Sequence, residues 1–231
     1  MSKRSLRLVV LGPGKTGSLV AEVARERGHT VQVIDAQMNQ DAAWLTDGNL
    51  RDIDVVIDFT RPDAVLANID ACMRARKAMV VGTTGWYGDV DRVRTAVEKA
   101  AAGFVFGANF SYGVNLFFQI AKAAAAALQH DYAGHITEIH HIHKKDAPSG
   151  TAAALQRILE QSTGVHVDIT SERKGEVTGT HILELDSSGD RIVLTHEAKS
   201  RRTFANGAVL AAEWIAGKTG FYDFKDIFSQ L

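Results

Sequence analysis

The stretch Leu6–Gly17 reads Leu-Arg-Leu-Val-Val-Leu-Gly-Pro-Gly-Lys-Thr-Gly. A run of leucine and valine ends in glycines, and Ser18–Arg27 then carries apolar residues on one helical face, which predicts a strand, a tight turn and a helix. The turn has the G-x-G-x-x-G pattern of a dinucleotide-binding loop, formed by Gly12, Pro13, Gly14, Lys15, Thr16 and Gly17. Its glycines allow close approach to a pyrophosphate, whose negative charge the helix N-terminus favours.

An acidic residue supports dinucleotide binding. A second strand, predicted over Thr30–Ile34, ends at Asp35, 18 residues after Gly17, and this spacing suits a carboxylate that bonds the ribose hydroxyls of an adenosine. A carboxylate repels a 2′-phosphate, and Ala36 supplies no cation to offset it, so we expect NADH to bind at least as well as NADPH. Lys15 is a cation within reach of a phosphate, so NADPH stays open as a cofactor.

Two other kinds of glycine loop share part of the pattern. Gly14-Lys15-Thr16 resembles the end of a Walker A loop, but that motif needs a glycine five places before Gly14, where Val9 stands. A glycine turn without a ligand would need neither the following helix nor Asp35. The pattern therefore favours a dinucleotide.

Strand and helix patterns alternate through the first half of the chain. Further strands are predicted over Asp54–Phe59, Ala78–Val81 and Phe104–Phe106, and helices over Asp63–Arg76 and Asp89–Ala102. This alternation predicts an α/β, Rossmann-like domain with a mostly parallel sheet covered on both faces. Ligands bind beyond the carboxyl ends of such strands, and two small loops stand there that suit a nicotinamide: Gly82-Thr83-Thr84-Gly85 and Gly107-Ala108-Asn109-Phe110.

After Asn109 the pattern becomes α+β. It predicts helices over Val114–Gln129 and Thr151–Gln161, and strands over Ile136–Ile142, Thr180–Asp186 and Arg191–Ala198. A last helix, Asn206–Ala216, is expected to return to the first domain. We therefore expect a dinucleotide-binding domain from residues 1–110 and 205–231, and a second domain from residues 111–204.

Composition limits the class of protein. Hydrophobic residues make up 45% of the 231 residues and the net charge is −1, which is typical of a globular protein and offers no footprint for nucleic acid or acidic lipids. Cys72 is the only cysteine, which excludes an internal disulfide. The apolar run Leu8–Leu11 after the basic start Met1–Arg4 is too short for a signal peptide, and no run is long enough to cross a bilayer, so we expect a cytoplasmic protein.

The expected chemistry lies in His140–Thr151, which reads His-His-Ile-His-Lys-Lys-Asp-Ala-Pro-Ser-Gly-Thr. Histidines titrate near neutral pH and suit proton transfer. The helix predicted over Thr151–Gln161 begins with free N–H groups near Gly150 and Thr151. Together with the lysines, these groups form a pocket for an anionic substrate, most simply a carboxylate. A solvated basic loop is the competing interpretation.

Strand geometry limits how these groups can act together. His140 and Lys144 would lie about 13 Å apart in an extended strand, too far for one small substrate to touch both. The strand is therefore expected to end near Ile142 or His143 and turn, with His140 as general acid and Lys144 as a second cation or proton donor. A metal site on the nearby histidines is disfavoured, because adjacent strand residues point to opposite faces and no cysteine is close.

Taken together, these motifs resemble the 4-hydroxy-tetrahydrodipicolinate reductase (dihydrodipicolinate reductase) family of the diaminopimelate route to lysine. The segments that carry the resemblance are Gly12–Gly17, Asp54–Pro62, Val81–Trp86, Ala108–Asn115, Glu138–Ala152 and Arg202–Trp214. The resemblance implies reduction of 4-hydroxy-tetrahydrodipicolinate, a cyclic dicarboxylate, to tetrahydrodipicolinate by NADH or NADPH. It also implies a homotetramer assembled through the second domain.

The resemblance implies roles for single residues. His140 takes the place of the proton donor/acceptor, Lys144 that of the catalytic lysine, and His141 that of a substrate-binding histidine. Gly150 and Thr151 would hold a substrate carboxylate, and the loops Gly82–Thr84 and Gly107–Phe110 would contact the nicotinamide. His143 and Lys145 receive no role.

The chain also departs from the family pattern. Ile142 and Ala36 stand where many members carry arginine, little sequence separates Asp35 from Asp52, and the glycine loop is one residue tighter. Three alternatives stay open: an aspartate-type amino-acid dehydrogenase with the same cofactor, a dinucleotide sensor without catalysis, and a metal-dependent hydrolase.

Overall fold

The computed structural model describes residues 4–231, which form two compact units. The first unit contains the chain up to Ser111 together with Arg202–Leu231, and the second is Tyr112–Arg201. The sequence predicted the divisions after residue 110 and before residue 205. Residues 1–3 lie outside the described residues. They belong to the basic start whose following apolar run is too short for a signal peptide.

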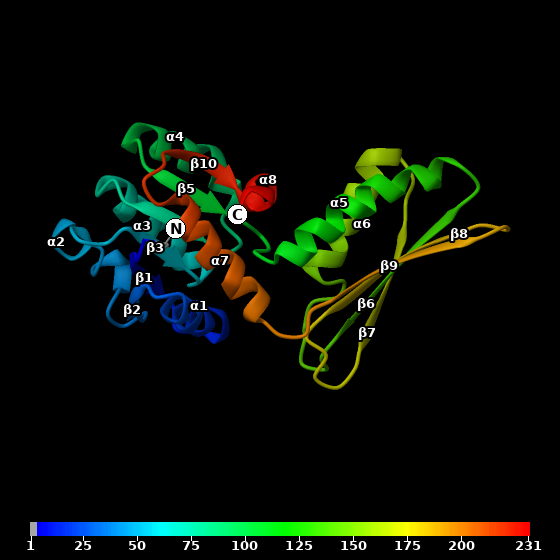
Figure 1. Ribbon diagram of the computed structural model, residues 1–231, viewed down its shortest axis with the longest axis horizontal. Helices are drawn as coiled ribbons and strands as arrows, with labels where there is room; N and C mark the ends of the chain where they lie inside the picture. The colour runs from blue at the N-terminus through cyan, green and yellow to red at the C-terminus, as the bar shows by residue number, and fades with distance from the viewer. Residues whose placement is uncertain (1–3) are drawn as a thin grey trace. The chain divides into compact units, whose positions relative to one another are not determined.

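A six-stranded parallel sheet forms the centre of the first unit, in the order β10-β5-β4-β3-β1-β2. Its strands are β1 (Arg7–Leu11), β2 (Thr30–Ile34), β3 (Val55–Asp58), β4 (Ala78–Val81), β5 (Gly103–Phe106) and β10 (Gly220–Asp223). The central strands are rich in valine and buried on both faces, as helical layers on both sides require. The predicted α/β, Rossmann-like fold is confirmed (Figure 1).

Two helical layers cover this sheet. α1 (Lys15–Glu26) and α7 (Arg202–Ile215) pack on one face, with the short α8 (Phe224–Ile227). α3 (Pro62–Arg74) and α4 (Val90–Ala100) pack on the other. The short α2 (Asp47–Leu50) and a 3₁₀ turn at Gln40–Ala42 occupy the connection between β2 and β3. The crossover from β1 leads to β2 on one side of it, and the next connection crosses back to β3 on its other side, which leaves a crevice beyond the carboxyl end of β1.

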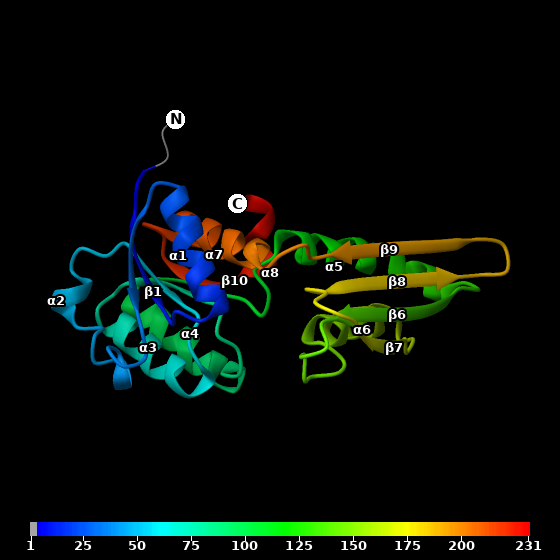
Figure 2. The same cartoon turned by 90° about the horizontal axis from the view of Figure 1, so that it is seen from below.

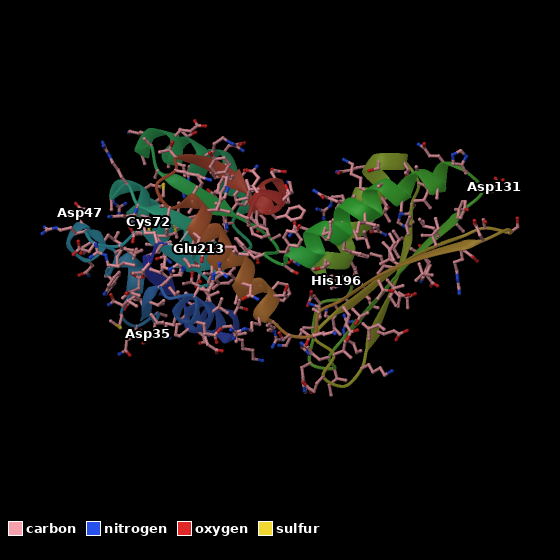
Figure 3. All side chains as sticks on the ribbon, viewed as in Figure 1. Asp35, Asp47, Cys72, Asp131, His196 and Glu213 are labelled. Atoms are coloured by element: carbon pink, nitrogen blue, oxygen red, sulfur yellow. The ribbon has the colours of Figure 1, made fainter. Side chains whose placement is uncertain are left out.

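The C-terminal segment is fastened to the first unit by charged pairs. Glu213 on α7, labelled in Figure 3, accepts hydrogen bonds from Arg27 at 2.6 and 2.8 Å and lies 3.0 Å from Nε2 of His29. Arg202 at the start of α7 pairs with Glu22 and Glu26 of α1. α7 begins at Arg202, four residues before its predicted start. The following strand, β10, was not predicted.

The second unit is a four-stranded mixed sheet with two helices on one side (Figure 1). Its strand order is β7-β6-β8-β9, formed by β6 (Ala133–His140), β7 (Asp168–Arg173), β8 (Thr180–Asp186) and β9 (Arg191–Glu197). β7 runs parallel to β6, whereas β6, β8 and β9 are antiparallel (Figure 2). α5 (Tyr112–Ala124) and α6 (Gly150–Thr163) bury an apolar core that includes Phe117, Leu155 and Ile136.

Several predicted bounds need correction. α1 begins at Lys15 rather than Ser18, because the second half of the glycine loop already forms its first turn. The helix predicted over Val114–Gln129 is α5, which tightens into a 3₁₀ turn at Ala125–Gln129. β7 was missed because its residues are mostly polar and exposed, as an edge strand permits. Within residues 4–231, no helix is both long and apolar enough to cross a membrane.

Candidate functional site

The glycine loop between β1 and α1 contains glycines of two kinds. A Cβ at Gly12, whose φ is +87°, would lie 2.5 Å from the carbonyl oxygen of Phe59, and one at Gly17 would lie 2.0 Å from that of Gly12. Gly12 and Gly17 are therefore required by the chain's own packing. A Cβ at Gly14 would meet no atom within 4 Å, so this glycine leaves open space at the N-terminus of α1. The loop fits a pyrophosphate that approaches the backbone at Gly14.

A cavity of about 460 Å³ lies beyond the carboxyl ends of β1 and β2. It is lined by the glycine loop and by side chains from the segments that follow β2 and β3, among them Asp35, Asn39, Thr60 and Asn68. Asp35, labelled in Figure 3, directly follows β2 and accepts the N–H of Met38 at 2.8 Å. The cavity is in the place and of the size that an adenosine half of a dinucleotide requires.

The lining of this cavity carries mostly negative charge. Asp35, Asp41 and Asp63 are its acidic residues. Arg61 is the one cation among the described residues that line it, and both of its hydrogen bonds, of 3.0 and 3.1 Å, go to Asp63. The described residues that line the cavity therefore offer no unpaired cation to an additional phosphate.

The loops predicted to contact the nicotinamide lie at the same end of the sheet. A second cavity, of about 290 Å³, is lined by Gly14–Gly17 on one side and by Gly82–Thr84 on the other. The Gly107–Phe110 loop follows the neighbouring strand, and its first N–H donates to the carbonyl oxygen of Val81 at 3.2 Å. In this loop Ala108 is exposed, Asn109 bonds the N–H of Ser111 at 2.8 Å, and Phe110 is buried. Every predicted cofactor residue thus lies in the first unit.

Asp58 is a structural centre of this region that sequence analysis missed. It ends β3, is fully buried, and its Oδ1 accepts hydrogen bonds from the Thr60 N–H, the Thr60 hydroxyl and the Thr83 hydroxyl, at 2.7–2.9 Å. Its Oδ2 accepts the Asn68 amide at 2.8 Å, and Asn68 in turn accepts from Asn39. Burial raises the pKa of Asp58, and the hydrogen bonds act against that rise. Asp58 thereby connects the adenosine cavity to the Gly82–Thr84 loop.

In the second unit, His140 is the last residue of β6 and faces the side of the sheet that the helices cover. Alternate strand residues share a face, and Ile136, Glu138 and His140 are the buried ones in this half of β6. Ile136 belongs to the apolar core. The same row of side chains therefore leads from the core to two titratable groups.

Glu138, to which sequence analysis gave no role, is fully buried and bonded through both carboxylate oxygens. Oε2 pairs with Nδ1 of His140, and Oε1 accepts Nη1 of Arg173 at 3.0 Å and the N–H of Ser149 at 3.3 Å. Burial raises the pKa of Glu138, but hydrogen bonds from Ser171, Arg173 and His140 outweigh burial and lower it from its ordinary value. Glu138 is therefore ionised at neutral pH.

A second histidine, His181 on β8, lies beside His140. The two ring centroids are 5.2 Å apart, and Nε2 of His181 lies 3.0 Å from Oγ of Ser149. Burial and the positive charge of His140 lower the pKa of His181 to about 4, so His181 is neutral at pH 7. Ser149 also caps α6, because its Oγ accepts the N–H of Ala152 at 3.2 Å.

The chain turns directly after β6. The strand ends at His140, two residues before its predicted end at Ile142, and the N–H of Lys144 donates to the carbonyl oxygen of His141 at 3.1 Å. Lys144 is thus brought back toward His140, close enough for its charge to lower the pKa of His140. Nζ of Lys144 donates to both carboxylate oxygens of Asp146 at 2.8 Å, which lowers the pKa of Asp146.

Arg173, at the end of β7, holds this turn in place. Besides its bond to Glu138, its guanidinium donates to the carbonyl oxygens of Asp146 at 2.6 Å and Lys144 at 3.4 Å. Sequence analysis missed Arg173 because β7 itself was missed, so that nothing placed this residue next to β6. Glu138 had a visible signal, since it stands two residues before His140 in a predicted strand and so shares its face.

The remaining predicted residues lie around the same turn. His141 is half-buried, and its Nε2 accepts from Arg201 at 3.4 Å. Gly150 and Thr151 stand in the first turn of α6, and a Cβ at Gly150 would meet no atom within 4 Å. His143 is exposed, with Glu176 at 3.6 Å. Among residues 4–231, no group of three or more His, Cys, Asp or Glu side chains is arranged to hold a metal ion.

Comparison with known families covers nearly the whole chain. A model described as "Dihydrodipicolinate reductase, N-terminus" matches residues 6–110, and one described as "Dihydrodipicolinate reductase, C-terminus" matches residues 113–228. The 4-hydroxy-tetrahydrodipicolinate reductase of Christiangramia forsetii is 38% identical over an alignment of 242 positions, which covers 98% of this chain and 99% of the relative. That of Neisseria meningitidis serogroup B is 41% identical over 203 residues, covering 78% and 74%.

Solved structures show the same fold. A dipicolinate-bound dihydrodipicolinate reductase from Paenisporosarcina sp. TG-14 superposes with a TM-score of 0.79 at 22% identity, covering 97% of this chain and all of that one. An aspartate dehydrogenase from Thermotoga maritima superposes with a TM-score of 0.51 at 11% identity, covering 89% and 94%. Both likenesses concern the fold, and the first is the stronger.

Proposed function

Because the chain belongs to the dihydrodipicolinate reductase family, we infer that it reduces 4-hydroxy-tetrahydrodipicolinate to tetrahydrodipicolinate with a nicotinamide cofactor. Curated relatives of this activity align with most or all of the chain. The structural observation that carries the inference is the cluster at the end of β6, where the imidazole of His140, the ammonium of Lys144 and the first turn of α6 gather in one small region.

The residues of the second unit divide the work on the substrate. We propose that His140, protonated, donates a proton, and that Lys144, His141 and the first turn of α6 at Gly150 and Thr151 hold the carboxylates. Cationic groups and a helix N-terminus stabilise anions, and they also favour hydride addition to a ring whose charge they offset. When bound, the nicotinamide supplies the hydride. One hydride and one proton enter, and the 4-hydroxyl group leaves as water.

The residues of the first unit fit the cofactor. We propose that Gly12–Gly17 hold the pyrophosphate, Asp35 the adenosine ribose, and the Gly82–Thr84 and Gly107–Phe110 loops the nicotinamide. The open space at Gly14 supports the first role, since internal packing does not explain this glycine. The cavity position of Asp35 supports the second.

The charge of the adenosine cavity supports NADH as the preferred cofactor. A 2′-phosphate would add negative charge beside Asp35, in a cavity that also contains Asp41 and Asp63. The guanidinium of Arg61 is already bonded twice by Asp63. Ala36 offers no cation, and Lys15 lines the neighbouring cavity rather than this one, so binding of NADPH would have to overcome repulsion without a compensating pair in the adenosine cavity.

We also propose a homotetramer assembled through the second unit. Among the described residues, no helix of this unit covers the outer face of its sheet, where Val193 is 47% exposed and Ile139 and Ile182 are half-buried (Figure 1). Apolar side chains on an uncovered sheet face are typical of an interface. Sedimentation at equilibrium would give four times the mass of one chain, and a monomer at micromolar concentration would contradict this assembly.

We also propose a cytoplasmic location, which fractionation of cells tests.

The activity is tested by following oxidation of NADH in the presence of substrate formed in situ from pyruvate and aspartate semialdehyde. We expect absorbance at 340 nm to fall only when pyruvate and aspartate semialdehyde are present together and have formed the substrate. Aspartate, pyruvate and aspartate semialdehyde supplied singly serve as controls. Turnover with aspartate and NAD⁺ but not with the complete mixture would instead identify an amino-acid dehydrogenase.

A further inference from the structure

Glu138 occupies a position in which a carboxylate is costly. It stands on the helix-covered face of β6, between the core residue Ile136 and His140, and it is 0% exposed. A buried ionised carboxylate loses its hydration and is tolerated only where hydrogen bonds and opposite charges replace it. An apolar side chain would continue the core at this point, so stability alone does not account for a glutamate here.

Besides a hydrogen bond from Ser171 on the neighbouring strand, the contacts of Glu138 go to parts of the proposed substrate site. Its Oε2 bonds Nδ1 of His140. Its Oε1 accepts the N–H of Ser149, the capping residue of α6, at 3.3 Å and the guanidinium of Arg173 at 3.0 Å. Arg173 in turn bonds the carbonyl oxygens of the turn that contains Lys144. One carboxylate thus joins the proton donor, the helix start and the lysine turn.

The bond to His140 fixes which nitrogen carries a proton. An ionised carboxylate only accepts hydrogen bonds, so Nδ1 of His140 must be the N–H donor. Nε2 is then the nitrogen left to exchange a proton. An added Cβ at Gly179 would lie only 2.9 Å from it, so the absence of a side chain at this glycine leaves room for that nitrogen.

We propose that Glu138 is a positioning residue for the reaction. It holds His140 with Nδ1 protonated and Nε2 as the atom that transfers the proton, and it ties this imidazole to the start of α6. The role rests on the proposed function, because only there does His140 donate a proton. Glu138 touches neither substrate nor cofactor in this scheme and acts through His140.

The charges around His140 predict how the loss of Glu138 changes its titration. Burial lowers the pKa of His140, Glu138 opposes this, and Lys144 and Arg173 lower the pKa further. The other titratable groups near the ring are Asp146 and the neutral His181. Without the Glu138 charge, the pKa of His140 falls further, so the protonated form is lost at a lower pH.

The first test is made on the wild-type protein and needs no substrate. In protein with ¹⁵N-labelled histidine, the two ring nitrogens of neutral His140 are distinguished by their NMR shifts, and the His140→Gln variant assigns the signals. We expect the neutral form of His140 to carry its hydrogen on Nδ1. A hydrogen on Nε2 in the neutral form would overturn the proposal, whether or not the protein proves to be this reductase.

The second test uses Glu138→Gln, which keeps the size of the side chain and removes its charge. We expect kcat to fall by at least about tenfold, because proton transfer contributes roughly 10²–10⁴ in rate. The KM for NADH should be unchanged, and the pH at which kcat is half-maximal should move to lower pH. A merely structural role would not move this pH. Wild-type kcat with an unchanged pH profile would overturn the proposal.

Two further variants complete the design. Glu160→Gln removes a half-exposed glutamate of α6 that pairs with His166 at 2.5 Å, and it should behave as wild type. Glu138→Asp keeps the charge but shortens the side chain, and its kcat should lie between those of wild type and Glu138→Gln. If Glu138→Gln does not fold, a Glu138→Asp protein with wild-type kcat and pH profile would overturn the proposal. Wild-type protein without reductase activity would contradict the proposed function, while the NMR result would still decide the placement of the proton.

Discussion

Two helices of this protein, α1 in the first unit and α6 in the second, begin with a glycine that has open space around it. A Cβ at Gly14 or at Gly150 would meet no atom within 4 Å. Their surroundings differ, however. α1 has no side-chain cap, whereas Ser149 caps α6 and is bonded to both Glu138 and His181. The first helix start is a site of backbone groups, and the second is part of a network of titratable side chains.

This difference indicates how the two units contribute to one reaction. Backbone N–H groups hold an anion without changing protonation, which suits a cofactor that must bind and leave. Imidazole, ammonium and carboxylate groups exchange protons and set local charge, which suits the chemical step. We therefore expect substitutions in the first unit to change cofactor affinity and those at the end of β6 to change turnover.

The largest effect is expected from replacing His140, the proposed proton donor, or Lys144. His140→Ala and Lys144→Ala should each lower kcat by roughly 10²–10⁴, the range of general acid catalysis. The Kd of NADH, measured by fluorescence titration, should stay within about twofold of wild type, because no predicted cofactor residue lies in the second unit. Near-normal kcat in both variants would contradict the roles assigned to the second unit.

Replacing Gly14 and Gly150 by valine, one at a time, tests whether the two helix starts bind different ligands. Gly14→Val should raise the Kd of NADH by roughly 10- to 100-fold, which corresponds to loss of a hydrogen bond to a charged group. Gly150→Val should raise the KM of the substrate by a similar factor and leave the Kd of NADH unchanged. Thermal melting should be nearly unaffected in both, because a Cβ at either position meets no neighbour within 4 Å. Equal effects of both variants on NADH would show that the two helix starts do not have separate ligands.

Gly17→Ala provides the matched control for the first variant. Its Cβ would lie 2.0 Å from the carbonyl oxygen of Gly12, so the backbone must shift. We expect a loss of about 1–3 kcal/mol in the free energy of unfolding, as for other overpacked sites. A melting temperature equal to that of wild type would contradict this view of the loop.

The smallest effect concerns the choice of cofactor. We expect NADPH to bind about fivefold more weakly than NADH, since one unscreened repulsion at contact distance is worth about 1 kcal/mol in water. Asp35→Asn should bring the Kd values of NADPH and NADH closer together, because it removes the nearest of the acidic groups. Titration of both dinucleotides against both proteins measures this, and tighter binding of NADPH to wild type would reverse the assignment.

The fold of the first unit was predictable because local signals and tertiary structure agree there. Thr30–Ile34 and Ala78–Val81 are strands with the predicted bounds, as is Thr180–Asp186 in the second unit. Each is short and rich in β-branched or apolar residues, which in Thr180–Asp186 are interleaved with polar ones. β7 could not be found in the same way, because its polar edge position removes the hydrophobic signal.

The candidate site was predictable only in part. The histidines, the lysine and the helix start stand next to each other along the chain, so their proximity followed from the sequence. Arg173 reaches them only because β7 pairs with β6, and His181 only because β8 does. The role of Glu138 depends on the phase of β6, which puts its side chain on the buried face. Contacts between distant strands require the sheet order, which local patterns do not contain.

The most direct test of the division of labour between the units follows the hydrogen atoms. The enzyme is given NADH carrying deuterium at both positions of nicotinamide C4, in ordinary water, with substrate formed in situ, and the product is analysed by mass spectrometry. We predict tetrahydrodipicolinate with one deuterium, at a rate that falls by at least about 100-fold in His140→Ala. Product without deuterium, or a rate unchanged by His140→Ala, would contradict the account.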